Sequence, residues 1–455
     1  RISVIKGTQS AIYGSDAIAG VVELETWRPQ ADGFSGQATL DLGSFSSRAA
    51  TLSLGFRDAR TELAFSLGRV VTDGFSARDS DTEEDGFEQS SANLFAAYQL
   101  TDTLRVGATA LWSDGTSEFD RSTTDSSGDS DETRRGVRLF GDYVTGGWQH
   151  NLSVSRYRTE RFDAGGFTQE FVGERDTVSY LARGDVSPTL ALALGADWTE
   201  ESATLDGTGS QASNAAVFGE LRANPNDRVE LSWTLRYDDY SDFDGQLSGR
   251  LALSWQTDAA TILRASVGTG YRAPSLYERF GPFAAGPLQP EDSRSFDLGV
   301  ERDLDGRGSV RATLFWSEID NLIRFDSVPS CLPTQFGCYT QIPGSTLTRG
   351  GEVTGDYQIT DRIRISGAYT LTSAKTEGNR LIRVPRHDLS LGLEADVTDQ
   401  LAMGVGVTHV ADALDGFGTP TPLDDYTVWD LTARYDLSDR ATLFAAIDNV
   451  TDTDY

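Results

Sequence analysis

Alternation of apolar and polar residues is the feature that most constrains the fold of this chain. In Leu104–Trp112, Val229–Tyr237 and Ile363–Leu371, every second residue is apolar or glycine, and the residues between are mostly polar or charged. The segment Val310–Trp316 follows the same rule. Successive side chains of a β-strand point to opposite faces of a sheet, so this pattern predicts strands with one apolar and one polar face. The sequence therefore predicts an all-β fold.

Alternation alone leaves two classes open, a soluble β-sandwich and a membrane β-barrel, because both can carry polar faces. The connections favour the barrel. Short turns recur at one end of the predicted hairpins, as at Leu100–Thr103, Thr360–Arg362 and Ser438–Arg440. Long polar loops, such as 121–134 and 327–343, fall at the other end. Short periplasmic turns opposite long extracellular loops are typical of an outer-membrane barrel, so we expect a transmembrane antiparallel β-barrel.

Charge and hydropathy restrict the function. With 39 Lys+Arg against 69 Asp+Glu, the formal net charge is −30, which makes nucleic acid a poor partner. No apolar stretch approaches the roughly 18 residues of a membrane helix. Barrel strands alternate and need no such stretch, so this absence leaves the barrel prediction intact.

The number of predicted strands is odd. From Phe34 onward we count about 21, whereas a closed single-chain bacterial barrel needs an even number. A strand left open in lipid would expose unpaired backbone groups. We therefore expect the partner of the last strand, 440–448, to lie beyond Tyr455.

The two cysteines, Cys331 and Cys338, lie in one predicted loop. A local disulfide formed in an oxidising compartment is the preferred interpretation, and two free thiols are the alternative. A metal site at this pair is not expected, because the three histidines, His150, His387 and His409, lie far away in the sequence. No catalytic constellation is found, so the sequence predicts no enzyme.

The opening segment adds a specific resemblance. Val4–Val22 is similar to the end of the plug domain of TonB-dependent outer-membrane receptors, although Lys6-Gly7-Thr8 stands where the family usually has Arg-Gly-Pro. Later segments resemble family signatures in the same order: 270–278, 288–291, 316–323, 349–353, 384–387 and 448–455. The resemblance implies that five residues belong to the plug motif: Gly7, Ser10, Tyr13, Gly14 and Gly20. The glycines would permit tight backbone turns.

This resemblance implies a domain organisation. Residues 1–33 would be the C-terminal remnant of a plug domain with its linker, and residues 34–455 a barrel of the ~22-strand type that lacks its last strand. The TonB box and most of the plug would precede Arg1. Within the family, the strand count and loop lengths are most similar to the cobalamin-receptor branch.

The function implied is TonB-dependent active uptake of a large, scarce solute, a cobalamin or a ferric siderophore, across the bacterial outer membrane. The implied partners are the TonB–ExbB–ExbD energy-transducing complex, acting through the N-terminal box, and a small-molecule metal chelate. Membrane lipid and lipopolysaccharide would surround the barrel. The alternative is a passive porin-like channel or a non-transport barrel, which would have no use for the segment Val4–Val22.

Acidic loops suggest a metal. Carboxylates are dense in residues 79–85 and 125–132, and oxygen-rich loops of this kind can bind calcium. Because cobalamin receptors order extracellular loops with calcium, the resemblance implies four candidate ligands: Asp114, Asp129, Asp131 and Asp163. A solvated loop is the alternative interpretation. No cofactor is required by the expected function, calcium in the extracellular loops is the one candidate, and no substrate-contacting residue is assigned.

Overall fold

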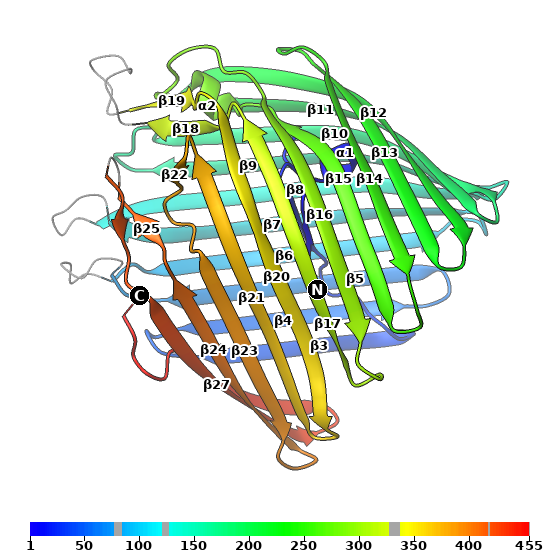
Figure 1. Cartoon of the computed structure of the whole chain (residues 1–455), viewed down its shortest axis with the longest axis vertical. Coiled ribbons are helices and arrows are strands. Elements are labelled where there is room, and N and C mark those ends of the chain that lie inside the picture. Colours follow the sequence, from blue (N-terminus) through cyan, green and yellow to red (C-terminus); the bar gives the residue numbers. More distant parts are fainter. Residues whose placement is uncertain (77–83, 121–126, 327–336, 417–418, 455) are drawn as a thin grey trace.

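The computed structural model describes residues 1–76, 84–120, 127–326, 337–416 and 419–454. Its strands form one large antiparallel sheet that curls into a barrel, with the start of the chain inside it (Figure 1). In the part of the chain that the structure describes, two short helices accompany the sheet, α1 (Ser10–Tyr13) and α2 (Leu276–Phe280). Among the described residues, no helix is long and apolar enough to cross a membrane.

The strands of the barrel follow one another in chain order. They are β3 (Gly33–Leu42), β4 (Arg48–Arg57), β5 (Thr61–Thr72), β6 (Phe87–Gln99), β7 (Leu104–Asp120), β8 (Ser127–Thr145), β9 (Trp148–Asp163), β10 (Glu170–Ser187), β11 (Leu190–Leu205), β12 (Thr208–Asn226), β13 (Val229–Tyr240), β14 (Gln246–Gln256), β15 (Thr261–Arg272), β16 (Glu291–Asp303), β17 (Gly308–Asp320), β20 (Ser345–Thr360), β21 (Ile363–Thr376), β22 (Asn379–Arg380), β23 (His387–Asp396), β24 (Leu401–Ala411), β27 (Tyr426–Ser438) and β28 (Ala441–Ile447). Three small hairpins lie outside this ring: β1 (Ile2–Lys6) with β2 (Gly20–Leu24), β18 (Ile323–Asp326) with β19 (Cys338–Gln341), and β25 (Leu414–Asp415) with β26 (Thr421–Pro422).

The period-two pattern predicted the two faces of the wall. In β13, Trp233 and Leu235 are 54% and 44% exposed on the outside, whereas the intervening Thr234 and Arg236 are 3% and 4% exposed on the lumen side. The same alternation runs through β17, where Leu314 is 62% exposed on the outside. An apolar exterior and a polar lumen are expected of a barrel in lipid. The all-β antiparallel prediction is confirmed.

The two rims also differ as predicted. On one rim, ten connections of two to four residues join the strands, from 58–60 to 439–440. The other, long-loop rim carries connections such as 273–290 and 321–344. Two connections on that rim have only two residues. Asp206 and Gly207 have φ of 47° and 82°, Glu377 and Gly378 have φ of 49° and 84°, and each pair closes a hairpin.

One predicted loop was too long. Residues 127–134 were expected in a loop, yet β8 begins at Ser127 and pairs with β7 from there onward. A strand can continue above the membrane wherever its neighbour supplies backbone hydrogen bonds, even when both faces are polar. Of the acidic residues expected in loops, Asp79, Asp81, Glu83 and Asp125 lie outside the described residues.

The barrel has 22 strands in its order, but β22 and β23 both pair with β21 and share one position in the ring. Twenty-one positions therefore remain. Neighbours alternate in direction, so β28 and β3 run the same way although they are adjacent in the order. Apart from β22 and β23, matched residue registers join all the other neighbours, whereas none joins the described residues of β28 to those of β3. Every residue of β28 is exposed.

Candidate functional site

The first 24 residues form a compact unit that sequence and backbone geometry explain together. Strands β1 and β2 pair from Ile2 with Leu24 to Lys6 with Gly20, and α1 lies between them. The glycines of the plug motif, Gly7, Gly14 and Gly20, have φ of 80°, 87° and 154°. A side chain at Gly20 would put its Cβ 2.5 Å from the carbonyl oxygen of Ile5. Glycine is therefore required where this hairpin closes.

This N-terminal unit lies in the lumen (Figure 1). Ser10, fully buried, donates a hydrogen bond to the carbonyl oxygen of Tyr271 at 3.5 Å, and the Ser15 hydroxyl accepts one from the Ala273 amide at 2.8 Å. Farther round the wall, Lys6 forms an ion pair with Glu352 of β20. Asp16 lies 3.8 Å from Arg175 of β10. Because the contacts reach from β10 to β20, the unit spans a large part of the bore. Tyr13 of the same motif is 52% exposed.

A buried arginine is the centre of the contact surface. Arg236 donates from Nε to Asp238 and from Nη1 to Asp197, both at 2.9 Å. Asp238 is fully buried and accepts a further bond from Asn214 at 2.8 Å. The guanidinium lies against Gly14, where an added Cβ would be 3.4 Å from Nη2. Each buried charge is thus paired, as a low-dielectric site demands.

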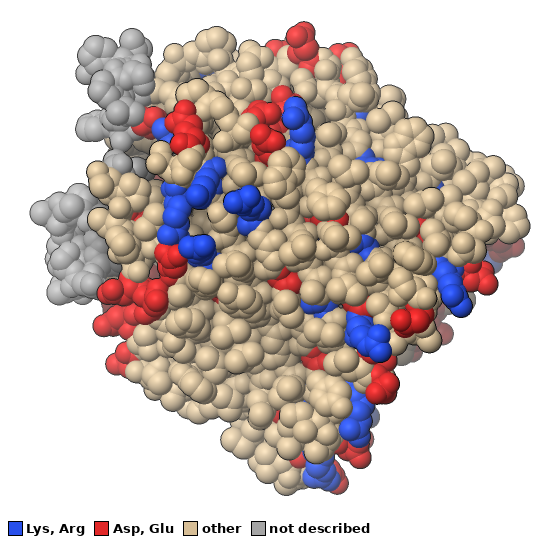
Figure 2. Space-filling model, in the orientation of Figure 1, with Lys and Arg blue, Asp and Glu red and all other residues tan. Residues whose placement is uncertain are grey.

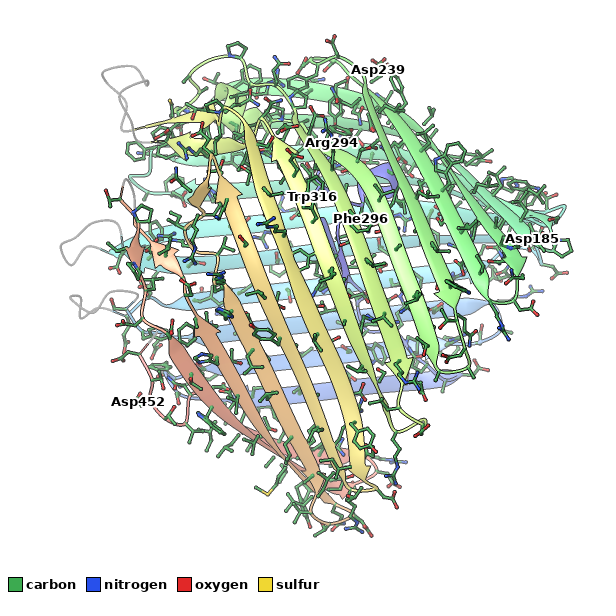
Figure 3. All side chains as sticks on the ribbon, viewed as in Figure 1. Asp185, Asp239, Arg294, Phe296, Trp316 and Asp452 are labelled. Carbon is green, nitrogen blue, oxygen red and sulfur yellow. The ribbon has the colours of Figure 1, made fainter. Side chains whose placement is uncertain are left out.

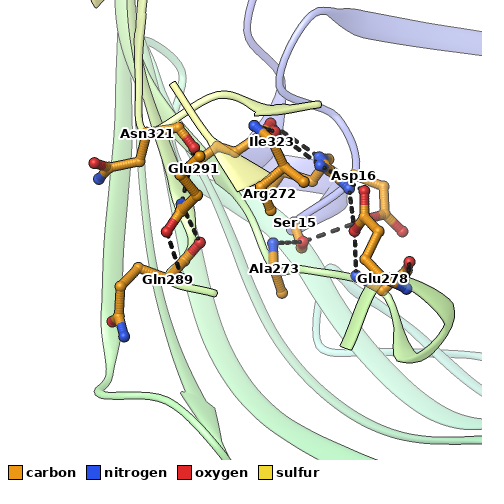
Figure 4. A network of polar contacts seen from close by, with 11 residues as sticks. Ser15, Asp16, Arg272, Ala273, Glu278, Gln289, Glu291, Asn321 and Ile323 are labelled. Carbon is orange, nitrogen blue, oxygen red and sulfur yellow. Dashed lines mark hydrogen bonds and ion pairs between the residues drawn. The ribbon is translucent and has the colours of Figure 1, made fainter. Parts of the chain in front are cut away.

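A second network joins the lumen to the long-loop rim (Figure 4). Arg272 donates two hydrogen bonds to Glu278 at 3.1 Å, and two to Glu291 at 2.8 and 2.9 Å. Glu278 also closes the capping box of α2 with Ser275. Glu291 accepts the amide of Ile323 at 2.7 Å. One arginine therefore fixes the end of β15, helix α2 and the start of β18 beside Ser15.

Six aromatic rings meet at the long-loop rim, and we call them the mouth cluster: Phe167, Phe171, Tyr277, Phe283, Phe325 and Tyr339. Ring centroids are 5.1 Å apart for Phe167 and Phe283, and 5.2 Å for Phe283 and Phe325. Tyr339 contacts Phe325 at 5.7 Å and Tyr277 at 6.3 Å, and Phe171 lies 6.5 Å from Tyr277. The cluster joins three loops, and the sequence did not predict it.

The mouth cluster has a covalent support. Cys338 is buried and disulfide-bonded directly before Tyr339. The other cysteine of the chain, Cys331, lies outside the described residues. Burial, together with Tyr277 and Glu278 nearby, raises the pKa of Tyr339, so its phenol stays protonated at neutral pH. Phe167 is 64% exposed and Phe325 40%.

The four candidate calcium ligands do not converge. Asp114, Asp129 and Asp131 lie in strands β7 and β8 on the outward face, not in a loop. Asp163 lies on the lumen face of β9, 3.0 Å from Arg161. Threonine hydroxyls donate to Asp114 and Asp131 at 2.7 and 2.6 Å. Among the described residues, no group of three or more His, Cys, Asp or Glu is placed to hold a metal ion.

A cavity of about 410 Å³ lies between Ile12 of α1 and the wall of β9 to β13, where Arg183, Glu220 and Arg222 line it.

The three histidines lie in strands, and each is hydrogen-bonded through Nδ1 to a hydroxyl of a neighbouring strand. His150 pairs with Tyr180, His387 with Tyr369 and His409 with Thr427, at 2.8 to 2.9 Å.

Comparison with known proteins gives a family match over most of the chain. Residues 26–450 match the TonB dependent receptor-like, beta-barrel family. The chain is 25% identical to the vitamin B12 transporter BtuB of Vibrio cholerae serotype O1, covering 100% of this chain and 76% of that protein. It is also 25% identical to the iron-regulated outer membrane virulence protein of the same species, covering 99% and 76%.

Solved structures share the fold. The siderophore receptor PirA of Pseudomonas aeruginosa superposes with a TM-score of 0.83 at 18% identity, covering 100% of this chain and 83% of that one. The copper transporter OprC gives a TM-score of 0.85 at 17% identity, covering 100% and 80%. Identities this low establish a common barrel architecture and leave the ligand open.

Proposed function

The chain belongs to the TonB-dependent receptor family, and from this premise we propose that it actively takes up a large, scarce solute, a cobalamin first of all, across the bacterial outer membrane. The family consists of outer-membrane receptors and transporters, not enzymes, and this chain is an outer-membrane β-barrel. The observation that carries the proposal is the barrel's own N-terminal unit, held in its lumen by the Ser10 and Ser15 hydrogen bonds and by the ion pair of Lys6 with Glu352. A passive pore gains nothing from such an obstruction.

We assign residues 1–33 to the end of a plug domain with its linker, and residues 34–455 to the barrel. The contact of Gly14 with Arg236 and the Ser15 hydrogen bond support this division, since each joins residues 1–33 to a strand or loop of the barrel. Energy would come from the TonB–ExbB–ExbD complex, which acts on a TonB box N-terminal to the plug. Pulling would strain the lumen contacts, which are polar and can be exchanged for water.

Cobalamin is the leading substrate because the vitamin B12 transporters align with the whole chain. A ferric siderophore is the second candidate, which the alignment with the iron-regulated virulence protein favours. The mouth cluster suits either, because partly exposed aromatic rings bind large ligands that carry apolar or planar surfaces. We infer that capture begins at this cluster.

The test is a binding titration of the full-length protein in detergent with cyanocobalamin and with ferric catecholate and hydroxamate chelates, each with and without calcium. Cobalamin should bind at micromolar concentration or below. Phe283→Ala should weaken binding about tenfold, through loss of ring contacts. The matched control is Phe444→Ala in β28, which lies near the short-turn rim and should leave affinity unchanged.

Each result decides something. Binding of a ferric chelate alone would transfer the assignment to siderophores, and binding of neither ligand class would overturn active uptake as proposed. An affinity that is independent of calcium would remove the calcium prediction for Asp114, Asp129, Asp131 and Asp163. Uptake by cells that persists after collapse of the proton-motive force would instead indicate a passive channel.

A further inference from the structure

The connection between the N-terminal unit and β3, residues 25–32, is held against the lumen wall by three of its residues: Trp27, Arg28 and Pro29. We call these three residues the linker clamp. Pro29 is fully buried. Trp27 packs on a cluster of buried side chains from three strands: Ala64, Phe95, Ala97 and Phe140. Connecting segments ordinarily run over a surface, so this burial calls for a physical reason.

The barrel wall is shaped to receive the clamp. A side chain at Gly55 of β4 would put its Cβ 2.9 Å from a ring carbon of Trp27 and 3.0 Å from Cδ of Pro29. Glycine therefore permits the close approach of the linker. Gly55 lies two residues before the end of β4, so the clamp is near the short-turn rim. Figure 3 shows Asp185 at that rim and Asp239 at the opposite, long-loop rim.

Arg28 is held by a ring and a carboxylate together. Its guanidinium lies 3.6 Å from the centroid of the Phe95 ring, and its Nη1 lies 3.8 Å from Oε1 of Glu62. Glu62 also accepts a hydrogen bond from Arg105 at 2.7 Å, and Arg105 lies 4.0 Å from Asp142. Charges of opposite sign thus alternate from the linker across β5, β7 and β8, and each attracts the next.

This row of charges lies on the lumen side of the wall. On β5, Ala64 is 4% exposed towards the linker, whereas its neighbour Leu63 is 42% exposed to the outside. Charge on a lipid-facing barrel wall is destabilising. Figure 2 shows mostly uncharged side chains in the middle of the outer wall that faces the viewer. The clamp is therefore joined to several strands from inside the barrel.

The clamp and Arg1 lie at the same end of the β1–β2 hairpin. The terminal amine of Arg1 donates to the carbonyl oxygen of Glu25 at 3.0 Å, and Trp27 is two residues farther along. Lys6 opposite Gly20 is the last pair at the other end. Backbone hydrogen bonds between antiparallel strands are perpendicular to the strands. A pull on Arg1 would therefore load these bonds one after another, provided that Glu25 cannot follow.

The hairpin needs an outside support for this. Its apolar side chains are 62–72% exposed, so the barrel wall does not cover them: Ile2, Val4, Val22 and Leu24. If residues 25–32 were loose, β2 would follow β1 under a pull, and the hairpin would move as one piece. Fixation of the linker decides which of the two happens.

We propose that the linker clamp is the fixed end against which force at the N-terminus acts, so that β1 is peeled from β2 while residues 27–32 stay on the wall. Trp27 and Arg28 are positioning residues, because they act through the hairpin. The inference rests on the proposed function for the source of the force. It limits the segment that can be displaced to the residues before Trp27, whichever solute is carried.

The test pulls the full-length protein by its N-terminus in single-molecule force spectroscopy, with the barrel held in a lipid nanodisc. In the wild type, the last release before barrel strands unfold should end ahead of Trp27. Trp27→Ala with Arg28→Ala should lengthen that release by residues 27–32, about 20 Å of extended chain. Arg28→Lys keeps a cation beside Glu62 and should stop near the wild-type length.

The matched control is Arg364→Ala, which removes an ion pair with Asp356 at 2.8 Å on β21, away from the linker. Its released length should equal that of the wild type. Heat-modifiable gel mobility reports whether each variant has folded as a barrel. Equal released lengths in the wild type and the folded double alanine variant would overturn the proposal.

A second measurement uses the natural source of force. In energised cells, the double alanine variant should admit a large antibiotic that the wild type excludes, and collapse of the proton-motive force should abolish this leak. A leak that persists without energy would mean that the residues only seal the structure, and would overturn their positioning role. A longer release in a protein that binds neither cobalamin nor a ferric chelate would support the clamp and count against the proposed function alone.

Discussion

The wall that holds the N-terminal unit differs from the wall of β24, β27 and β28. On the first, lumen-facing polar groups are buried, as with Arg236 at 4% and Ser293 at 2% exposure. On the second, every residue of β28 is exposed, and Arg434 of β27 keeps 61% of its side chain exposed. Both walls come from the same alternating pattern. The difference teaches that contact with the chain's own N-terminal unit, rather than the barrel itself, excludes water from the lumen side.

The largest effect should come from breaking the charges on the buried wall. Arg236→Ala leaves the buried Asp238 carboxylate without a cationic partner. This loss should lower the free energy of unfolding by about 3–5 kcal/mol. Arg434→Ala removes an exposed ion pair with Asp436 and should cost under about 1 kcal/mol. Guanidinium unfolding of both variants in detergent measures the two costs. Similar values would remove the distinction between the walls.

The second largest effect should come from a change in the backbone where the hairpin of the N-terminal unit closes. Gly20→Ala adds a Cβ 2.5 Å from a backbone oxygen, so the hairpin must open or shift, at about 3 kcal/mol. Gly306→Ala is the control, because it also has positive φ, 71°, but meets nothing within 4 Å and should cost about 1 kcal/mol. Hydrogen exchange should show loss of protection in residues 1–25 for Gly20→Ala alone. Protection that survives would mean that the hairpin tolerates the shift.

A single hydrogen bond should give a smaller effect. Ser15→Ala removes the acceptor of the Ala273 amide, at about 1 kcal/mol. Thr442→Ala removes an exposed hydrogen bond to Asp436 on the opposite wall and should be close to neutral. Amide hydrogen exchange near residue 15 should become faster in the first variant, and exchange near residue 442 should not change in the second. This result would sharpen the comparison of the two walls. The reverse order would contradict it.

The sequence predicted the barrel because alternation and turn length depend only on local residues. It could not predict which charges meet inside. Arg236 reaches Asp197 because β11, β12 and β13 pair in one register, and that register follows from the whole sheet. The plug motif fared differently. Its glycines were expected to permit tight backbone turns, and each has positive φ within the same short segment.

The candidate calcium ligands show that the sequence could not predict which face of the wall a residue occupies above the membrane. The resemblance to cobalamin receptors implied that Asp114 and Asp163 share one extracellular loop region, but the structure places them on opposite faces of the wall. Where a strand rises above the membrane, both of its faces are polar, and alternation no longer tells inside from outside. The mouth cluster was missed for a related reason. Its rings come from three separate loops and from the start of β10, and the neighbouring cysteine pair was the one local feature in that region.

The smallest effect should be that of pH on the ion pairs at the wall of β24, β27 and β28, which does not hold the N-terminal unit. The Arg383 ion pair lowers the pKa of Asp415 below its ordinary value, as the Arg380 hydrogen bond does for Asp412. A lowered folded-state pKa gives stability that is present above the ordinary value near pH 4 and is lost as the pH falls through the folded value. Acidification from pH 7 to pH 3 should therefore release the connection between β24 and β27.

A nitroxide label at Asp424→Cys should report that release as increased mobility in electron paramagnetic resonance. Arg383→Ala should make the label more mobile already at pH 7 and flatten its response to acid, because one of the two ion pairs is then absent at every pH. The N-terminal unit should stay protected at a pH where the label has become mobile, since burial shields its contacts. If the N-terminal unit lost protection at the same pH at which the label became mobile, the two walls would unfold as one cooperative unit. They would then differ in solvent exposure but not in stability.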